Sequence, residues 1–336
     1  MSDKKPVLLS GIQPSGQLCI GNYLGAIKNW QSLQKNHDSI FLVVDMHALT
    51  AKQHPATLRH TCLSYVAQYI ACGIDPEQST IVIQSHVPQH AELMWILSTI
   101  TYMGELNRMT QFKDKSTRHS SRNINAGLFT YPILMASDIL IYQADLVPVG
   151  ADQKQHLELA RDLADRFNSQ YSDTFVVPEP YIPKLGARIM SLQEPDKKMS
   201  KSDNNLNNLI AILDNPDCIR KKIQRAVTDS STEIIIDKSR PGISNLINLY
   251  ALISDMSTIE VEKRFEGKMY SDFKLELGDL MVEYLQPIQY RYEKIVQDKA
   301  YLKSILKRGA ENAYHRARKT LTKVYRKVGF IPNIIG

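Results

Sequence analysis

Short apolar runs alternate with longer segments of helical periodicity through the first half of the chain. The apolar runs are residues 7–11, 40–44 and 80–84. The helical segments are residues 55–72, which end before Gly73, and residues 88–103, which end before Gly104. Unbroken apolar runs predict strands buried on both faces, and the segments between them predict crossover helices. The order predicts an α/β fold with a Rossmann-like, doubly wound parallel sheet.

The alternation continues to about residue 180 and then gives way to helices. Residues 133–142 and 153–168 predict helices, and residues 145–150 predict a short strand between them. After the Pro-rich residues 177–183 the pattern is mainly helical. We therefore expect a Rossmann-like catalytic domain at 1–190 and an all-helical domain at 191–336, and we leave open whether the last helix packs back on the first domain.

Composition changes this picture little. Hydrophobic residues make up 43% and charged residues 23% of the chain, which is ordinary for a globular protein. No apolar run is long enough to span a bilayer, and the first residues do not resemble a signal peptide, so we expect a cytoplasmic protein without membrane association. The four cysteines form no C-x2-C pair, and the sequence therefore predicts no metal site of its own.

Positive charge is concentrated at the C-terminal end. From Tyr301 onward there are nine Lys and Arg residues and one acid, Glu311, a net charge of +8, which leaves −2 for the rest of a chain whose total is +6. Basic residues gathered on one helical end are typical of a surface that binds a polyanion. A solvated helix face is an equally good interpretation of such a run.

Two short segments far apart in the sequence carry the candidate chemistry. Residues 10–16 and 19–22 lie where the first strand leads into a helix, and Gly11, Gly16 and Gly21 allow tight turns there. The free N–H groups and the dipole of the following helix favour phosphate. The second segment, residues 198–202, presents two ammonium groups and two hydroxyls that can stabilise a leaving pyrophosphate. Each segment alone is also compatible with an ordinary surface loop.

Together, the two segments resemble the ATP-binding signatures of class I aminoacyl-tRNA synthetases. The first stands in place of the HIGH motif, and the second reads Lys-Met-Ser-Lys-Ser, the KMSKS motif letter for letter. The first is similar to the form found in bacterial-type tryptophan-tRNA synthetases, except that Cys19 replaces the usual Thr. Further segments resemble the same family over nearly the whole chain; they are residues 44–48, 104–106, 108–113, 130–138, 148–156, 186–190, 226–230 and 241–246.

The resemblance implies roles for individual residues. The implied ATP-binding residues are Gln13, Pro14, Ser15, Gly21, Asn22, Gly150, Ala151, Asp152, Ile189, Lys198, Met199, Ser200, Lys201 and Ser202. The implied catalytic residues are Lys115, Lys198 and Lys201. The implied tryptophan-binding residues are Asp138, Met135, Tyr131, His47 and Gln153. Mg²⁺ would be bound mainly through ATP, since no acidic metal cage is evident.

A role for Asp138 in selecting tryptophan can also be argued from its chemistry. An indole has one N–H donor and no acceptor, so a buried carboxylate beside apolar walls selects it and rejects phenylalanine, which offers no donor. The competing role of a lone Asp in an apolar helix is a cap or a salt-bridge partner. Asp152 has a competing role as a helix cap, and His47 and His156 are equally compatible with satisfied core histidines.

The resemblance implies a two-step reaction. ATP and L-tryptophan give tryptophanyl-adenylate and pyrophosphate, and tryptophan is then transferred to the 3′ end of tRNA(Trp) by a homodimer. Alternatives are a tyrosine-tRNA synthetase, which shares the fold and both signatures, a non-catalytic RNA-binding paralogue, and a small-molecule nucleotidylyltransferase. The run from Met135 to Asp138 argues against a phenol pocket, and the intact lysines of the second signature argue against lost catalysis.

Overall fold

Five parallel strands form the centre of the molecule in a computed structural model that describes residues 5–113, 125–150, 153–181 and 188–332. Their order is β3-β2-β1-β4-β5, with bounds β1 Val7–Ile12, β2 Asp38–Val43, β3 Ser79–Ile83, β4 Leu146–Pro148 and β5 Glu179–Tyr181. The sheet is extended outward from β1 in both directions, so the strand order reverses between β1 and β4. The expected Rossmann-like α/β fold is therefore confirmed.

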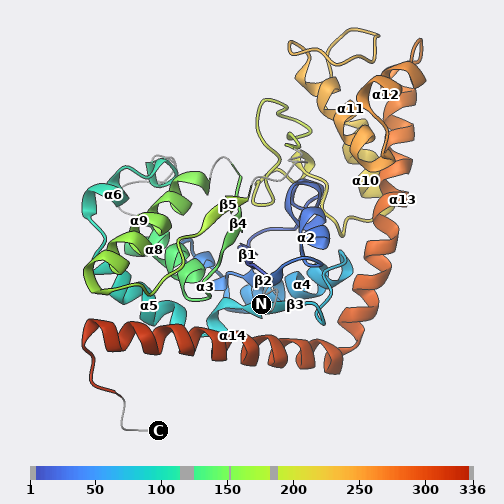
Figure 1. Cartoon of the computed structure of the whole chain (residues 1–336). Helices are drawn as coiled ribbons and strands as arrows, with labels where there is room; N and C mark the ends of the chain where they lie inside the picture. The colour runs from blue at the N-terminus through green and yellow to red at the C-terminus, as the bar shows by residue number, and fades with distance from the viewer. Residues whose placement is uncertain (1–4, 114–124, 151–152, 182–187, 333–336) are drawn as a thin grey trace.

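Helices cover both faces of the sheet (Figure 1). In β1, Leu8 packs into one buried cluster while its neighbours Val7 and Leu9 pack into the other. This alternation shows why the strand has no polar face. The helices and helical turns up to the last strand are α1 Ile20–Asn22, a π-helical turn Tyr23–Ile27, α2 Lys28–Leu33, α3 Asp45–Ala48, α4 Pro55–Ala71, a 3₁₀ turn Gln84–His86, α5 Gln89–Ser98, α6 Met103–Asn107, α8 Ala126–Leu140 and α9 Lys154–Tyr171.

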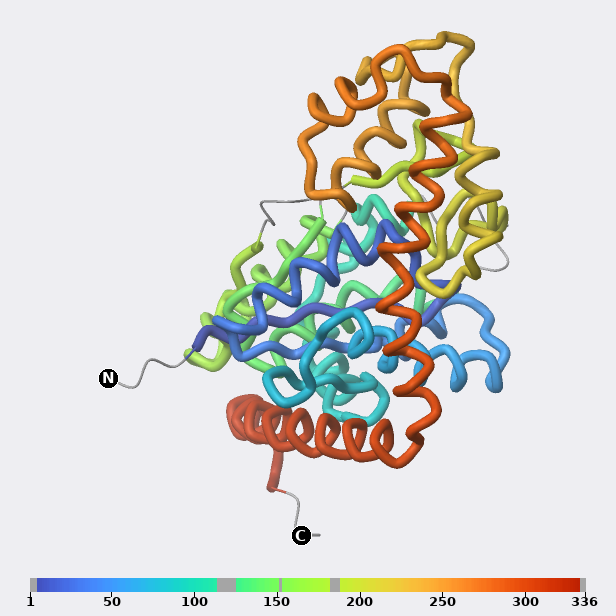
Figure 2. The backbone as a smooth tube through the Cα atoms, turned by 90° about the vertical axis from the view of Figure 1, so that its right-hand side faces the viewer, coloured from blue at the N-terminus to red at the C-terminus, as the bar shows by residue number. Residues whose placement is uncertain are grey.

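The C-terminal part is helical and returns to the sheet. Its elements are a 3₁₀ turn Leu206–Asn208, α10 Pro216–Gln224, α11 Pro241–Ser254, α12 Thr258–Arg264, α13 Tyr270–Gln297 and α14 Lys299–Val328. Helices α10 to α12 and one end of α13 form a lobe at the top of Figure 1, and α13 descends from it to α14 at the bottom. Figure 2 shows the same descent from the side.

Helix α14 lies against β3 and α5. A β-carbon at Gly309 would lie 1.9 Å from the carbonyl oxygen of Ile81, so the helix can approach the strand this closely only with glycine there. Arg316 pairs with Asp38 at 2.9 Å, and Arg308 pairs with Glu77 at 2.7 Å. The last helix thus contacts the Rossmann-like part, while the domain division at residue 190 stays a proposal.

Two local expectations were wrong. The predicted helix at 88–103 is broken after α5, and α6 begins at Met103 and contains Gly104. The break is stabilised by Glu105, whose carboxylate accepts from the backbone N–H of Tyr102 at 2.8 Å and caps the new helix. Strand β5 was not predicted because it lies in the Pro-rich stretch, where Pro180 occupies an edge strand. No helix in the described ranges is long and apolar enough to cross a membrane.

Candidate functional site

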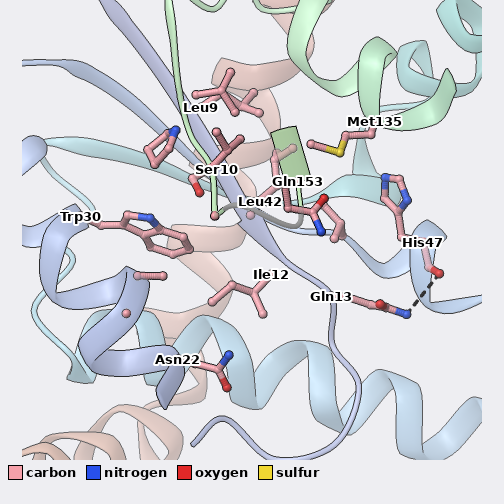
Figure 3. Close-up of a pocket in the computed structure, with 18 of the residues that line it drawn as sticks. Leu9, Ser10, Ile12, Gln13, Asn22, Trp30, Leu42, His47, Met135 and Gln153 are labelled. Carbon is pink, nitrogen blue, oxygen red and sulfur yellow. Dashed lines mark hydrogen bonds between the residues drawn. The ribbon is translucent and has the colours of Figure 1, made fainter. Parts of the chain in front are cut away.

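A cavity of about 820 Å³ opens at the point where the strand order reverses (Figure 3). The ends of β1 and β4 both line it, through Ile12 and Pro148. Ligands of open α/β sheets bind in such a crevice, beyond the carboxyl ends of the strands. In the view of Figure 3, His47 and Met135 lie to the right of the cavity, and Asn22 and Trp30 lie to the left.

The first signature loop forms one wall of this cavity. Gln13, Gly21 and Asn22 line it, and the amide of Gln13 donates to the carbonyl oxygen of His47 at 3.2 Å, the dashed line in Figure 3. Pro14 and Ser15 belong to the same loop but are not among the described residues that line the cavity. The loop therefore presents Ser10, Ile12 and Gln13 to a ligand, and helix α1 presents Gly21 and Asn22.

Cys19 has a structural role at the start of α1. It is fully buried, and its thiol and backbone N–H donate to Oδ1 of Asn22 at 3.1 and 3.2 Å. Burial raises the pKa of this thiol above its usual value, so it stays protonated and can donate. The backbone of the next residue, Ile20, donates to Ile210 at 2.9 Å. This replacement of the usual Thr therefore orients Asn22, which lines the cavity.

The second signature packs directly against the first and lines the same cavity. Its start pairs with a neighbouring segment through an antiparallel bridge between Met190 and Lys198, and the N–H of Met199 donates to Ile189 at 2.9 Å. Asn245 of α11 holds Met190 by two hydrogen bonds to its backbone, at 2.9 and 3.0 Å. As a result Ile189, Lys198 and Met199 line the cavity.

The two lysines of the second signature have different environments. Lys198 lines the cavity, whereas the half-buried Lys201 points to the back of the first loop. Its ammonium donates to the carbonyl oxygen of Gln13, and it lies 3.3 Å from Oγ of Ser15 and 3.4 Å from the hydroxyl of Tyr65. Burial away from water lowers the pKa of Lys201 from 10.5 to about 7.

The hydroxyls of the second signature lie apart from the cavity. Oγ of Ser200 and Oγ of Ser202 are 3.2 Å from each other, and both residues are exposed. The sequence predicted that Ser200, Lys201 and Ser202 bind ATP. None of the three is among the described residues that line the cavity. A ligand phosphate would have to draw these side chains toward the cavity.

Asp138 lines the end of the cavity where His47 lies. It is 3% exposed, and its carboxylate accepts from His47 at 2.8 Å on Oδ2 and from His90 and Gln84 at 2.7 Å each on Oδ1. Burial by itself raises the pKa of this carboxyl, but the hydrogen bonds from His47 and His90 outweigh burial and lower the pKa to about 2. The carboxylate is therefore ionised and able to accept a further donor.

The other predicted tryptophan-binding residues surround this end. Tyr131, Met135 and Gln153 all line the cavity together with His47, and Gly150 lines it near β4. The hydroxyl of Tyr131 lies 2.9 Å from Nε2 of His156, whose Nδ1 lies 3.1 Å from Oε1 of Gln153. His156 is buried and bonded at both nitrogens, so the structure favours its interpretation as a satisfied core histidine.

Three predicted site residues cannot be placed, and two residues that contact Asp138 were not predicted. Lys115, Ala151 and Asp152 lie outside the described residues. Gln84 and His90 were not predicted, because a polar residue at a strand end and a histidine in an amphipathic helix carry no distinctive pattern. Among the residues that the structure describes, no group of three or more His, Cys, Asp or Glu could hold a metal ion.

Comparisons with known proteins agree with one another. The family model "tRNA synthetases class I (W and Y)" matches residues 1–286. A tryptophan–tRNA ligase of Clostridium acetobutylicum is 55% identical over 331 residues, which cover 98% of this chain and 99% of the relative. The crystal structure of tryptophanyl-tRNA synthetase from Mycoplasma pneumoniae has a TM-score of 0.89 and 35% identity, with coverage of 97% of this chain and 98% of that chain.

A further solved structure is similar over the whole length and carries ligands. Tryptophanyl-tRNA synthetase from Campylobacter jejuni, complexed with ADP and tryptophane, has a TM-score of 0.84 and 36% identity, with coverage of 96% of this chain and 100% of that chain. The high identity to a tryptophan enzyme over nearly the full length decides against the tyrosine alternative. The chain belongs to the class I tRNA synthetase family (W and Y) and, within it, to the tryptophan–tRNA ligases.

Proposed function

We propose that the cavity binds L-tryptophan at its Asp138 end and ATP at its signature end, and that the two react there to give tryptophanyl-adenylate and pyrophosphate. The observation that carries this proposal is the cavity itself, which joins an ionised, nearly buried carboxylate to both signatures. The carboxylate oxygen of tryptophan attacks the α-phosphorus of ATP in line, and the bond to the β-phosphate oxygen breaks. Positioning and charge stabilisation do most of this work.

The tryptophan end of the cavity suits an indole. Met135 and Tyr131 supply apolar contact, and Asp138 offers its charge to the indole N–H. Gln153 and His47 lie beside these groups and complete the polar part of the wall. Such a site rejects phenylalanine, because phenylalanine offers no donor to the acceptor position of Asp138 that the indole N–H would fill.

The ATP end is formed by Gln13, Gly21, Asn22, Gly150 and Ile189, with Lys198 and Met199 of the second signature beside them. Lys198 lines the cavity and is the lysine of the second signature available to the phosphates. We propose that bound triphosphate draws Lys201 out of its contact with Gln13, and that the phosphate charge raises the pKa of its ammonium. Pro14 and Ser15 support the loop, while Ser200, Ser202 and Met199 move with the second signature.

We extend this proposal to the residues and partners beyond the described site. Lys115 reaches the phosphates, Gly150 and Asp152 contact the ribose, and Ala151 belongs to the same ATP-binding segment. Mg²⁺ is bound through the phosphate oxygens of ATP and supplies charge neutralisation there. In the second step the ribose hydroxyl of the terminal adenosine of tRNA(Trp) attacks the acyl carbon, and AMP leaves. The active form is a homodimer.

ATP–pyrophosphate exchange with each of the twenty standard amino acids tests the first step. We expect exchange that depends on tryptophan and on Mg²⁺, with tyrosine and phenylalanine far less active. Exchange that depends on another amino acid would contradict the assignment of the Asp138 end, and no exchange with any amino acid would support a non-catalytic paralogue. Charging of tRNA(Trp) by the same preparation tests the second step, and sedimentation tests the dimer.

A further inference from the structure

We propose that His90 and Tyr142 are positioning residues for tryptophan selection, which act as a chain of hydrogen bonds that fixes the rotation of the Asp138 carboxylate. The inference rests on the proposed role of Asp138 in binding the indole, and it adds residues that do not line the cavity. Neither residue touches the substrate in this account. Their effect is to determine which carboxylate oxygen faces it.

This chain of hydrogen bonds begins at a buried hydroxyl, that of Tyr142. Tyr142 is 2% exposed, and its hydroxyl lies 2.8 Å from Nε2 of His90. His90 is fully buried, and its Nδ1 lies 2.7 Å from Oδ1 of Asp138. Tyr142 follows Asp138 by four residues and lies in the turn after α8, so one short segment of the polypeptide carries both ends of this series of hydrogen bonds. The hydroxyl of Ser137 donates to the backbone oxygen of His90 at 2.6 Å and fixes the histidine from a second side.

The direction of the protons follows from the carboxylate. An ionised carboxylate only accepts, so Nδ1 of His90 must carry a proton and donate to Asp138. We assign the lone pair to Nε2, which then accepts from the hydroxyl of Tyr142. With this assignment the Tyr142 hydroxyl, both ring nitrogens of His90 and the Asp138 carboxylate each have a hydrogen-bond partner, as buried polar groups require.

The two carboxylate oxygens are thereby made unequal. Oδ1 accepts from His90 and from Gln84, neither of which lines the cavity. Oδ2 accepts from His47, which does line it. Two donors on Oδ1 hold that oxygen to the protein interior and direct Oδ2 to the cavity, where one acceptor direction is left for an indole N–H. Rotation of the carboxylate would break these bonds, so the chain holds the acceptor in place before the substrate arrives.

A tryptophan analogue makes this role measurable. In L-3-benzothienylalanine a sulfur atom replaces the indole N–H, so the analogue fills the same space but cannot donate. The ratio of kcat/KM for tryptophan to that for the analogue, measured by ATP–pyrophosphate exchange, therefore reports the hydrogen bond to Asp138 and not general stability. Tyr142→Phe removes the donor to His90, His90→Leu removes the donor to Asp138, and His90→Asn retains an N–H near the Nδ1 position.

We expect Tyr142→Phe to lower the ratio by roughly five- to tenfold, and His90→Leu to lower it by roughly 10²-fold, because a buried donor or acceptor is left without its partner. His90→Asn should recover part of the ratio that His90→Leu loses. The KM for ATP should stay near the wild-type value in each. The matched control is Tyr69→Phe, which removes another fully buried hydroxyl, one that donates to the backbone oxygen of Leu42 at 3.1 Å. It should leave the ratio unchanged.

The possible outcomes distinguish this inference from the proposal on which it rests, that Asp138 binds the indole N–H. A wild-type protein that activates both amino acids equally well overturns the role of Asp138, and this inference with it. A wild-type preference that Asp138→Asn abolishes, but that Tyr142→Phe and folded His90→Leu leave intact, overturns the inference alone. If His90→Leu does not fold, Tyr142→Phe decides, since it removes a single oxygen atom. A loss of ratio in Tyr69→Phe equal to that in Tyr142→Phe would also contradict the inference.

Discussion

A β-carbon added at Gly16 would lie 1.8 Å from the carbonyl oxygen of Lys201. The two signatures therefore touch, although nearly the whole sheet lies between them in the sequence, and the backbone N–H of Gln17 donates to the same carbonyl at 3.2 Å. Gly16 has φ +64°, a conformation that favours glycine. The site is built from this contact: one loop supports the other, and both reach the cavity.

Gly16→Ala should push the two signatures apart. We expect a loss of roughly 1–3 kcal/mol in stability from the left-handed backbone and the clash with the Lys201 carbonyl, together with a marked fall in adenylate formation, because Lys198 would lose its place at the cavity. Gly267→Ala is the matched control. Gly267 has φ +73° with no atom within 4 Å of the added carbon, so it should cost about 1 kcal/mol and leave activity intact. Thermal unfolding and pyrophosphate exchange measure the two effects, and equal activities in both variants would argue against the contact.

Lys201 should titrate far below an ordinary lysine when no ligand is bound. Its pKa is lowered from 10.5 to about 7 by burial, so the folded chain holds this proton less tightly than the unfolded chain. The buried position is therefore least favourable below pH 7 and becomes more favourable as the pH rises from about 7 toward 10.5. Competitive acetylation followed by peptide mass spectrometry should give a midpoint near pH 7 for Lys201 in the native protein and near 10.5 in the denatured protein. A native midpoint near that of the denatured protein would show that the ammonium is not buried.

Asp138→Ala should remove selection for tryptophan. We expect a loss of roughly 2–4 kcal/mol in the transition-state stabilisation measured by kcat/KM for tryptophan, the cost of a charge-assisted hydrogen bond in a closed pocket. ATP affinity should change little, since the hydrogen bonds of Asp138 go to His47, His90 and Gln84 and to none of the residues assigned to ATP. Titration of ATP into the same preparation controls for folding, because His47, His90 and Gln84 lose their shared acceptor. Full tryptophan activation by this variant would disprove the assignment.

The basic C-terminal helix should divide into two functional groups. Arg308 and Arg316 pair with acids of the Rossmann-like part, so Arg316→Ala should cost up to about 1 kcal/mol of stability with little change in tRNA charging. Arg318, Lys319 and Lys323 are exposed. Replacing these three by Gln should weaken tRNA charging and flatten its salt dependence while pyrophosphate exchange stays normal. Charging that is unchanged at low and high salt would remove tRNA contact from this helix.

The sequence predicted the parts of the fold that depend on a strong local pattern. Strands β1 to β3 were predicted because their residues are apolar on both faces, and α4 because Pro55 and Gly73 delimit a regular stripe. Strand β5 was missed because three residues with a central proline give no periodic signal. The break before α6 was missed because a capping glutamate overrides an otherwise continuous helical pattern.

The candidate site was predictable only where a motif marks it. Gln13, Gly21, Lys198 and Asp138 were expected together, and all line one cavity. The position of Lys201 was not predictable, because it depends on a tertiary contact with the back of the first loop. The bonds from His90 and Gln84 to Asp138 were equally hidden, since they join residues from three elements that only folding brings together.

A crystal structure of this chain with tryptophan and a non-hydrolysable ATP analogue tests the account most directly. It should show the indole nitrogen about 3 Å from Oδ2 of Asp138, the phosphates between the two signatures, and the ammonium of Lys201 moved from Gln13 to a phosphate oxygen. An indole bound away from Asp138, or phosphates outside the space between Asn22 and Lys198, would contradict it.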